Sequence, residues 1–238
     1  MTVEYFEYLG KKSSDFGLLI DADISFASPQ VKGEYVDVAG TDGELFVGDG
    51  KLSNVKKSFP VFLENPRTQT VATDVSNWLK SSLKTWNPLY FSGDPNYMYE
   101  AIYTDEYDID ANVESYGKTV LTFTVKPTKF LKSGLTAITA PSNLTNPTQR
   151  DAKPIIIIKG TGNITLKIGA ETLTLKSVDG GVVIDCLKQT VTNLTGTAPA
   201  WDKVTSYPLP VIKPGKQTVL TTGTITELKI TPRYEVIV

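Results

Sequence analysis

Alternation of apolar and polar residues dominates the second half of the chain. Residues 163–168 (NITLKI) alternate strictly, so that their aliphatic side chains share one face and their polar side chains the other. This two-residue period is that of a β-strand with one buried face. Residues 171–176 (ETLTLK) repeat it after Gly169 and Ala170, which predicts a β-hairpin with a two-residue turn.

Glycines mark the ends of the other strands expected in this half. Residues 179–181 (DGG) predict a turn that leads into a strand over 182–186. Two more strands are expected over 216–222 and 225–238, with Gly223 between them. The pattern is therefore one of short strands separated by glycine-containing turns.

The aliphatic run at residues 154–158 (PIIII) has no polar position. A strand of this kind is covered on both faces, as in the core of a sandwich. No segment after about residue 150 has the apolar spacing of an amphipathic helix. Residues 154–238 are therefore expected to form a β-sandwich.

One segment of the first half has helical spacing. Residues 74–86 (DVSNWLKSSLKTW) place apolar side chains three and four residues apart. Asp74 or Thr73 is expected to cap the N-terminus. The helix is expected to end before Asn87 and Pro88, because the residue before a proline avoids helical dihedral angles.

Strands are expected around this helix at Leu18–Ile24, Tyr35–Ala39 and Tyr99–Asp108. The last of these is expected to belong to a long hairpin that pairs residues 99–110 with residues 118–126. The first half is therefore expected to be β-rich with one α-helix.

A segment without periodicity separates the two halves. Residues 132–153 are rich in serine, threonine, asparagine and proline, a composition typical of a linker. The predicted organisation is an N-terminal domain over 1–130, a linker over 131–153 and a sandwich domain over 154–238. A chain of 238 residues is long enough for two such domains.

Histidine is absent from the chain and cysteine occurs once. A chain without histidine has no Ser-His-Asp or Cys-His catalytic pair and no His-ligated zinc. A single cysteine forms no intrachain disulfide, so Cys186 is expected to be a small buried residue. The sequence indicates no catalytic residues, no bound metal and no cofactor.

The net charge of −2 conceals an uneven distribution. Residues 1–130 contain 12 Lys and Arg against 19 Asp and Glu, whereas residues 131–238 contain 12 against 7. The overall balance argues against a dedicated nucleic-acid binder. No secretory signal and no apolar run of about 20 residues is evident, so a soluble protein is expected.

The densest group of carboxylates lies near residue 110. Residues 108–112 are spaced like the start of an EF-hand loop, which places an oxygen ligand at every second residue. Val113 stands where that loop needs glycine and Thr119 where it needs glutamate, so a solvated strand face is the favoured interpretation. The group comprises Asp105, Glu106, Asp108, Asp110 and Glu114.

Aromatic side chains are a second class of candidate site, because saccharides stack on exposed rings. Trp201 and Tyr207 lie in the expected sandwich and are the candidate saccharide-stacking residues. Trp78 and Trp86 belong to the expected helix, where a role in packing is favoured.

Four strings of residues follow one another along nearly the whole chain. Residues 10–17 (GKKSSDFG) contain an SS-x-FG sequence, and residues 38–45 (VAGTDGEL) form a glycine-containing turn. Residues 89–103 form an aromatic-rich strand after the expected helix, and residues 208–234 contain the strings PLP, KPG and ITPRY. Each string is typical of a turn or a strand, and the order and spacing of all four make the set specific.

This set resembles the distal tail proteins of siphophages, the hub at the tip of a long non-contractile tail. The turn at 38–45 is similar to the V-P-G-R-D-G-x-L turn of that family, from which Ala39 and Thr41 depart. Tyr234 stands where the closing segment of the family has tryptophan. The length of this chain matches the minimal form of the family, which lacks an inserted carbohydrate-binding module.

The resemblance implies a mainly β fold, with a ring-forming N-terminal domain that contains one α-helix and a C-terminal galectin-like β-sandwich. It also implies a homo-hexamer around the tail channel, located at the tail tip of the virion after synthesis in the cytoplasm of the bacterial host. The implied partners are the tail tube, a tail-tip protein and a receptor-binding protein. The resemblance implies no enzymatic activity, no cofactor and no membrane.

Residues for the ring interface are expected on two apolar strands that the sequence suggests are exposed. The acidic groups of residues 1–130 are expected to line the channel, so that phage DNA passes without specific binding. The candidate interface residues are Leu45, Phe46, Leu89 and Phe91.

Two other functions compete with this interpretation. The first is a carbohydrate-binding β-sandwich module without enzymatic activity, in which Trp201 and Tyr207 stack on the saccharide. The second and less favoured is a hydrolase that uses a pair of carboxylates about 5–10 Å apart.

Overall fold

The structure, a computed structural model, describes the chain except for residues 1–3, 21–23, 64–67, 109 and 113–115. It divides into two compact units. Unit 1 comprises residues 1–129 and 237–238, and unit 2 comprises residues 130–236. Unit 2 is therefore inserted between two segments of unit 1.

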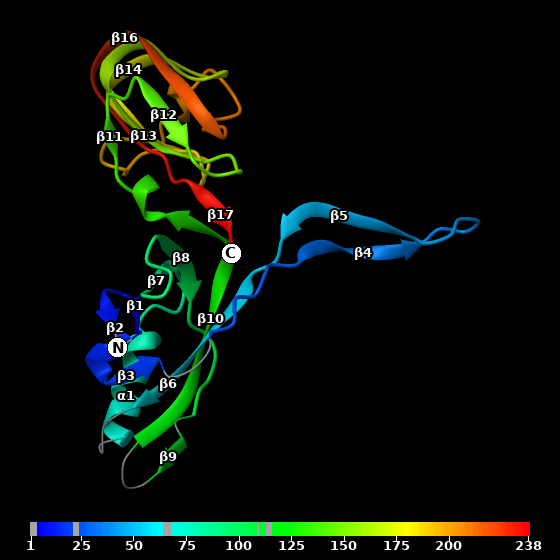
Figure 1. Cartoon of the computed structure of the whole chain (residues 1–238). Helices are drawn as coiled ribbons and strands as arrows, with labels where there is room; N and C mark the ends of the chain where they lie inside the picture. Colours follow the sequence, from blue (N-terminus) through cyan, green and yellow to red (C-terminus); the bar gives the residue numbers. More distant parts are fainter. Residues whose placement is uncertain (1–3, 21–23, 64–67, 109, 113–115) are drawn as a thin grey trace. The chain divides into compact units, whose positions relative to one another are not determined.

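Unit 1 is built on a sheet of nine strands among the described residues (Figure 1). The order is β2-β1-β7-β8-β10-β6-β3, and β9 and β17 also pair with β10. The strands are β1 (Phe6–Tyr8), β2 (Lys11–Lys12), β3 (Leu18–Ile20), β6 (Val55–Leu63), β7 (Asn87–Phe91), β8 (Tyr97–Ile102), β9 (Asp110–Asn112), β10 (Tyr116–Leu131) and β17 (Glu235–Ile237).

The alternation of β6 explains why this segment is a central strand. Its odd-numbered side chains from Val55 to Leu63 are buried, and its even-numbered side chains are exposed or half-buried. β10 pairs with it in an unbroken antiparallel register, from Val125 opposite Val55 to Gly117 opposite Leu63. A one-residue slip would turn the buried side chains toward water, so the pattern fixes this register.

The strands expected in the first half are present with different bounds. β3 begins with the expected Leu18–Ile24 strand, of which residues 21–23 lie outside the described residues. β8 and β10 are neighbours in the sheet, as the expected hairpin requires.

The helix α1 (Thr68–Leu79) packs on this sheet. The indole of Trp78 stacks between two aromatic rings, with centroids 5.7 Å from Phe6 and 4.6 Å from Phe16. Its Nε1–H donates a hydrogen bond of 2.9 Å to the carbonyl oxygen of Tyr8. Trp78 therefore ties the helix to β1 and to the 3-10 helix η1 (Ser13–Phe16).

The helix begins earlier than the sequence predicted. It starts at Thr68, so Thr73 and Asp74 lie inside it and the expected cap at these residues is wrong. The capping preference of aspartate and threonine is a weak signal compared with the packing of an apolar face.

The helix also ends earlier than predicted, at Leu79. Ser81 donates to the carbonyl oxygen of Trp78 from its backbone N–H at 3.2 Å and from its hydroxyl at 2.8 Å, which closes the last turn. Leu83 and Trp86 are 56% and 36% exposed, so no buried face is present along which the helix could continue.

Replacing Trp78 with phenylalanine is expected to lower the free energy of unfolding of unit 1 by about 1–2 kcal/mol, because the Tyr8 carbonyl loses its buried donor. Urea unfolding of the full chain followed by circular dichroism measures this loss. The half-exposed Trp86→Phe is the matched control and should change the free energy by less than about 0.5 kcal/mol. Equal losses in the two variants would contradict the assigned role of the Nε1 hydrogen bond.

Unit 2 contains a six-stranded sheet of order β11-β16-β13-β14-β15, with β12 paired to β16. Two 3-10 helices accompany it, η2 (Lys132–Gly134) and η3 (Trp201–Lys203). The strands are β11 (Ile138–Thr139), β12 (Asn143–Asn146), β13 (Ile155–Ile168), β14 (Glu171–Asp185), β15 (Thr190–Asn193) and β16 (Gly215–Thr231).

Three of these strands are much longer than the sequence predicted. The turn expected at residues 179–181 is a bend inside β14, and Gly223 lies inside β16. The expected strands at 154–158 and 163–168 are both parts of β13, apart from Pro154. The expected strand breaks are therefore wrong, whereas the hairpin around Gly169 is present as the β13–β14 connection.

Glycines lie where the three long strands bend together. Gly160 of β13 pairs with Gly180 of β14, and the register shifts between Gly162 and Ile164. Gly223 of β16 has φ of 101°, and a Cβ there would lie 2.3 Å from the carbonyl oxygen of Asn163. A residue without a side chain is needed for strands to approach so closely.

The bend folds the sheet of unit 2 over itself and encloses one core. Ile156 and Ile158, before the bend of β13, belong to the same buried cluster as Ile164, Leu166 and Ile168 after it. The core is thus made by two layers of a single curled sheet. The prediction of a mainly β fold with one α-helix is confirmed in the described part of the chain.

Residues 131–153, expected to be a linker, form ordered parts of unit 2. The amide of Asn146, 2% exposed, donates to the carbonyl oxygens of Arg150 at 2.8 Å and Ile212 at 2.9 Å. Its carbonyl oxygen accepts from the backbone N–H of Thr148 at 3.0 Å. Because polar contacts hold this segment, it lacks the apolar periodicity by which a strand is recognised.

Two paired strands, β10 and β17, carry the chain between the units. The backbone N–H of Leu131 donates to Tyr234 at 2.9 Å, and that of Val238 donates to Pro127 at 3.0 Å. The chain therefore leaves unit 1 and returns to it through neighbouring strands.

Candidate interaction surfaces

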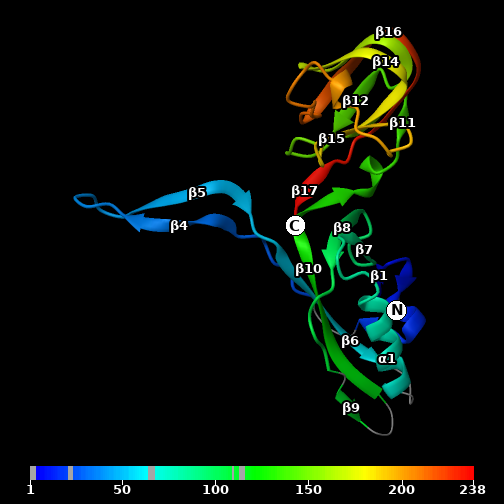
Figure 2. The same cartoon turned by 180° about the vertical axis from the view of Figure 1, so that it is seen from behind.

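A hairpin of unit 1 forms a two-stranded sheet of its own. It consists of β4 (Val31–Asp37) and β5 (Glu44–Leu52), and we call it the arm. Every described side chain of the arm is exposed except Leu52, which is half-buried. Among the described residues no third strand pairs with it (Figures 1 and 2).

One face of the arm is aromatic. Tyr35 and Phe46 lie directly opposite each other on the two strands, with ring centroids 5.1 Å apart. The ring of Phe46 covers Gly33 and Gly48, since a Cβ on Gly33 would lie 2.4 Å from Phe46 Cζ. Tyr35 nevertheless stays 68% exposed and Phe46 42% exposed.

The opposite face of the arm is aliphatic. Val36 lies opposite Leu45, and Val47 lies on the same face two residues further along β5. These side chains are 40%, 58% and 49% exposed, respectively. The arm therefore presents apolar surface on both faces, although a solvated hairpin normally has at least one polar face.

The four residues predicted for a ring interface fall into two groups. Leu45 and Phe46 lie on the arm and are exposed. Leu89 and Phe91 are 0% and 5% exposed in the core of unit 1, so the prediction that they lie on an exposed strand is wrong. Their strand, β7, lies between β1 and β8 in the middle of the sheet, which their short apolar sequence could not reveal.

Trp201 and Tyr207 are both on the surface of unit 2. Trp201 begins η3 and is 40% exposed, and Tyr207 is 78% exposed in the segment before β16. Among the described residues neither ring stacks on another aromatic ring, and neither lines the two cavities described below. The structure therefore leaves both rings available for contact.

The carboxylates near residue 110 do not gather into a metal site in the part that is described. Asp105 is paired with Lys56 at 2.7 Å, and this hydrogen bond lowers the pKa of its carboxyl group. Glu114 lies outside the described residues, as does the side chain of Asp110. Elsewhere among the described residues, no three Cys, Asp or Glu side chains are placed to hold a metal ion.

Cys186 and Lys57 are ionisable residues with buried side chains. Burial raises the pKa of the Cys186 thiol to about 12, so this residue stays neutral and packs in the core of unit 2 as expected. Burial and, to a smaller extent, the nearby charge of Lys129 lower the pKa of Lys57 to about 8. The ammonium group of Lys57 lies 4.8 Å from the ring centroids of Phe26 and Tyr99. Its charge is thus held by aromatic faces.

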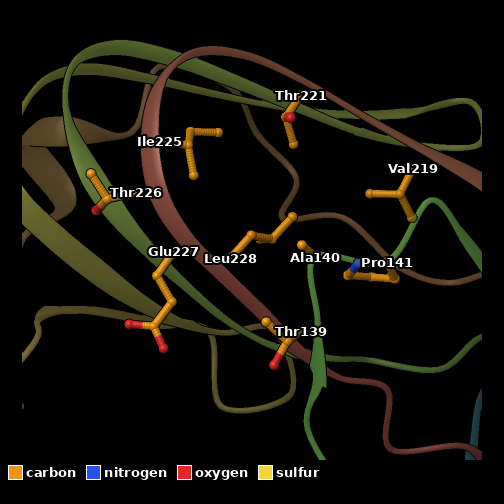
Figure 3. A pocket seen from close by; sticks show the side chains of 9 residues that line it. All are labelled: Thr139, Ala140, Pro141, Val219, Thr221, Ile225, Thr226, Glu227 and Leu228. Carbon is orange, nitrogen blue, oxygen red and sulfur yellow. The ribbon is translucent and has the colours of Figure 1, made fainter.

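The described surface contains cavities in both units. One, of about 320 Å³, lies beside α1 over the stacked rings of Phe16 and Trp78. Another, of about 310 Å³, lies in unit 2 at the bend of β16 (Figure 3). It is lined by Thr139, Ala140, Pro141, Val219, Thr221, Ile225, Thr226, Glu227 and Leu228.

No helix within the described ranges is both long enough and apolar enough to cross a membrane. No family model matches the chain, and no curated protein matches it significantly in sequence.

A solved structure matches over the whole length. It is the crystal structure of the Dit (gp 19.1) protein of phage SPP1, described as a paradigm of the hub adsorption apparatus in phages that infect Gram-positive bacteria. The TM-score is 0.71 at 15% sequence identity, and the match covers 99% of this chain and 100% of that one. The chain thus has the fold of a siphophage distal tail protein, as the four sequence strings predicted.

Proposed function

We propose that the chain is a structural hub protein of a phage tail tip, and that six copies form a ring that joins the tail tube to the host-adhesion device. The observation that carries the ring is the arm, which exposes apolar side chains on both faces. The full-length similarity in fold to a phage hub protein supports the same general role.

The apolar faces of the arm are unfavourable in water. A two-stranded hairpin alone is marginally stable, and contiguous apolar surface on a soluble protein usually marks an interface. A neighbouring copy that covers the aromatic and the aliphatic face of the arm buries this apolar surface and stabilises the hairpin. In a closed ring each subunit uses two different patches, and the arm supplies one of them.

The charge distribution fits a ring that encloses a passage for DNA. Residues 1–130 have seven more Asp and Glu than Lys and Arg. An acidic lining repels the phosphate backbone, so DNA passes without being retained. The proposed protein partners are the tail tube on one side of the ring and a tail-tip or receptor-binding protein on the other.

The ring is tested by the mass of the protein in solution. The wild-type chain is expected to give a light-scattering mass of six chains of 26.0 kDa. The double variant Val36→Glu, Leu45→Lys should run as a single chain. It removes apolar surface from one face of the arm, and its opposite charges across the strands favour the hairpin.

The matched control is Leu83→Lys, because Leu83 is 56% exposed in the same unit but outside the arm. This variant should keep the mass of the wild type. A wild-type mass of one chain at high micromolar concentration would contradict the ring. A double variant that still forms six-chain particles would contradict the role of the arm.

A further inference from the structure

The cavity of unit 2 exists because β16 makes a detour. The N–H of Val219 donates to the carbonyl oxygen of Ser142 at 2.9 Å, and the N–H of Ala140 donates to that of Leu228 at 2.8 Å. Ala140 and Ser142 are separated by Pro141 alone. Their partners on β16, Leu228 and Val219, are separated by the eight residues 220–227. β16 therefore arches away, as Figure 3 shows, and leaves a hollow under the arch.

The arch leaves a free strand edge along this hollow. β12 pairs with β16 only as far as Thr218, and β11 pairs only from Lys229 onward. On the facing side Pro141 has no N–H with which to continue the ladder. Ala140 beside it has φ of 43°, a left-handed conformation that is strained for a residue with a Cβ. Strain of this kind is often kept at a binding site.

The lining of the cavity has an unusual chemical composition. The hydroxyl groups of Thr139, Thr221 and Thr226 each supply a donor and an acceptor. Aliphatic side chains of Val219, Ile225 and Leu228 provide apolar contact surface. No lysine, arginine or aromatic residue is among the nine that line it.

Glu227 adds a carboxylate group to this lining. Hydrogen bonds from Lys159 and Lys229 lower the pKa of its carboxyl group to about 2, so it is ionised at neutral pH. A carboxylate paired in this way keeps lone pairs with which it accepts hydrogen bonds from ligand hydroxyls. Its charge is balanced by the two lysines, so Glu227 offers no unpaired charge to an ionic ligand. The lining contains no aromatic ring on which a flat aromatic ligand could stack.

We propose that this cavity binds a neutral saccharide unit. Ligand hydroxyls exchange hydrogen bonds with the threonine hydroxyls and with Glu227, while the C–H faces of the sugar ring lie on the aliphatic side chains. The volume of about 310 Å³ lies at the lower end of the range for ligand sites and suits one or two sugar units. The proposal does not depend on ring formation, and it uses neither Trp201 nor Tyr207.

The test is direct binding to the full-length chain. Saturation-transfer difference NMR is recorded with glucose, galactose, N-acetylglucosamine, maltose, lactose and chitobiose as probes. At least one probe should give a difference signal and should shift the amide resonances of residues 219–228. The double variant Thr221→Val, Thr226→Val should bind that probe about tenfold more weakly, because two hydrogen bonds are lost while shape is kept.

The matched control is Thr222→Val, Thr224→Val, which changes two exposed threonines of the same arch that do not line the cavity. This control and Trp201→Ala should bind as the wild type does, and all variants should keep its thermal unfolding midpoint. Failure of every probe to bind at the highest soluble concentration would overturn the proposal. So would binding that is lost in Trp201→Ala, or binding of unrelated extended peptides in place of all six sugars.

Discussion

Replacing Arg233 with methionine is expected to destabilise unit 2 by about 3–5 kcal/mol, since it leaves a partly buried carboxylate without its partner. The Arg233 side chain donates from Nη2 to Asp185 Oδ1 at 2.6 Å and to the carbonyl oxygen of Pro154 at 3.2 Å. Its Nε donates to the carbonyl oxygen of Lys153 at 2.7 Å. One side chain thus joins the segment after β16 to β14 and to the start of β13.

The measurement is urea unfolding of the full chain, followed through the amide NMR signals of unit 2. Lys213→Ala breaks the exposed pair between Lys213 and Asp151 and serves as the control, with little change expected because exposed ion pairs contribute little. If Arg233→Met also left the unfolding transition of unit 2 unchanged, the hydrogen bonds of Arg233 would not contribute to the stability of this unit.

The hydrogen bond between Arg233 and Asp185 also makes the stability of unit 2 depend on pH. Burial alone would raise the pKa of Asp185, but hydrogen bonds from Arg233 and from the backbone of Lys188 and Leu187 outweigh it and lower the pKa below 3.8. The stabilisation is therefore present above the unfolded pKa and is lost as the pH falls through the folded pKa. In Asp185→Asn, unfolding of unit 2 should depend less on pH between about 5 and 2 than in the wild type.

Substituting alanine for Gly223 is expected to cost unit 2 about 2–4 kcal/mol. The φ of 101° is unfavourable for any residue with a Cβ, and that Cβ would lie 2.3 Å from a backbone oxygen of Asn163. Backbone atoms of a paired strand cannot move aside as the end of a flexible side chain can. The strands β13 and β16 must therefore separate at the bend.

Gly196→Ala separates the two causes of this loss. Gly196 also has a positive φ, of 72°, but a Cβ there meets no atom within 4 Å. Its substitution should cost only about 1 kcal/mol, from the backbone conformation alone. Thermal unfolding of both variants under the same conditions gives the comparison, and equal losses would mean that close strand approach at Gly223 is unimportant.

The alternating patterns allowed much of the fold to be predicted from the sequence. The strands around Gly169, the apolar run at 154–158 and the single helix are all present. Where a strand ends was harder to predict, because residues 179–181 and Gly223 suit a hairpin turn and a bend inside a strand equally well. The choice between them depends on the neighbouring strand, which local sequence does not contain.

The burial of individual side chains and the positions of cavities were harder still to predict from the sequence, because both depend on tertiary structure. Leu89 and Leu45 belong to similar short apolar segments, yet one lies in the middle of a sheet and the other on the arm. The cavity of unit 2 brings Thr139 together with residues 219–228, about 80 positions later in the chain. No motif spans such a distance, so this site could only be found once the pairing of β11 and β12 with β16 was known.

The two strands that connect the units also bear on how such a chain can evolve. Unit 2 begins and ends on β10 and β17, which are paired with each other, so its two ends are adjacent. A domain with adjacent ends can be lengthened, shortened or exchanged for another without altering the fold of its host. The adjacent ends of unit 2 therefore allow this unit to be exchanged while the strands of unit 1 keep their pairing.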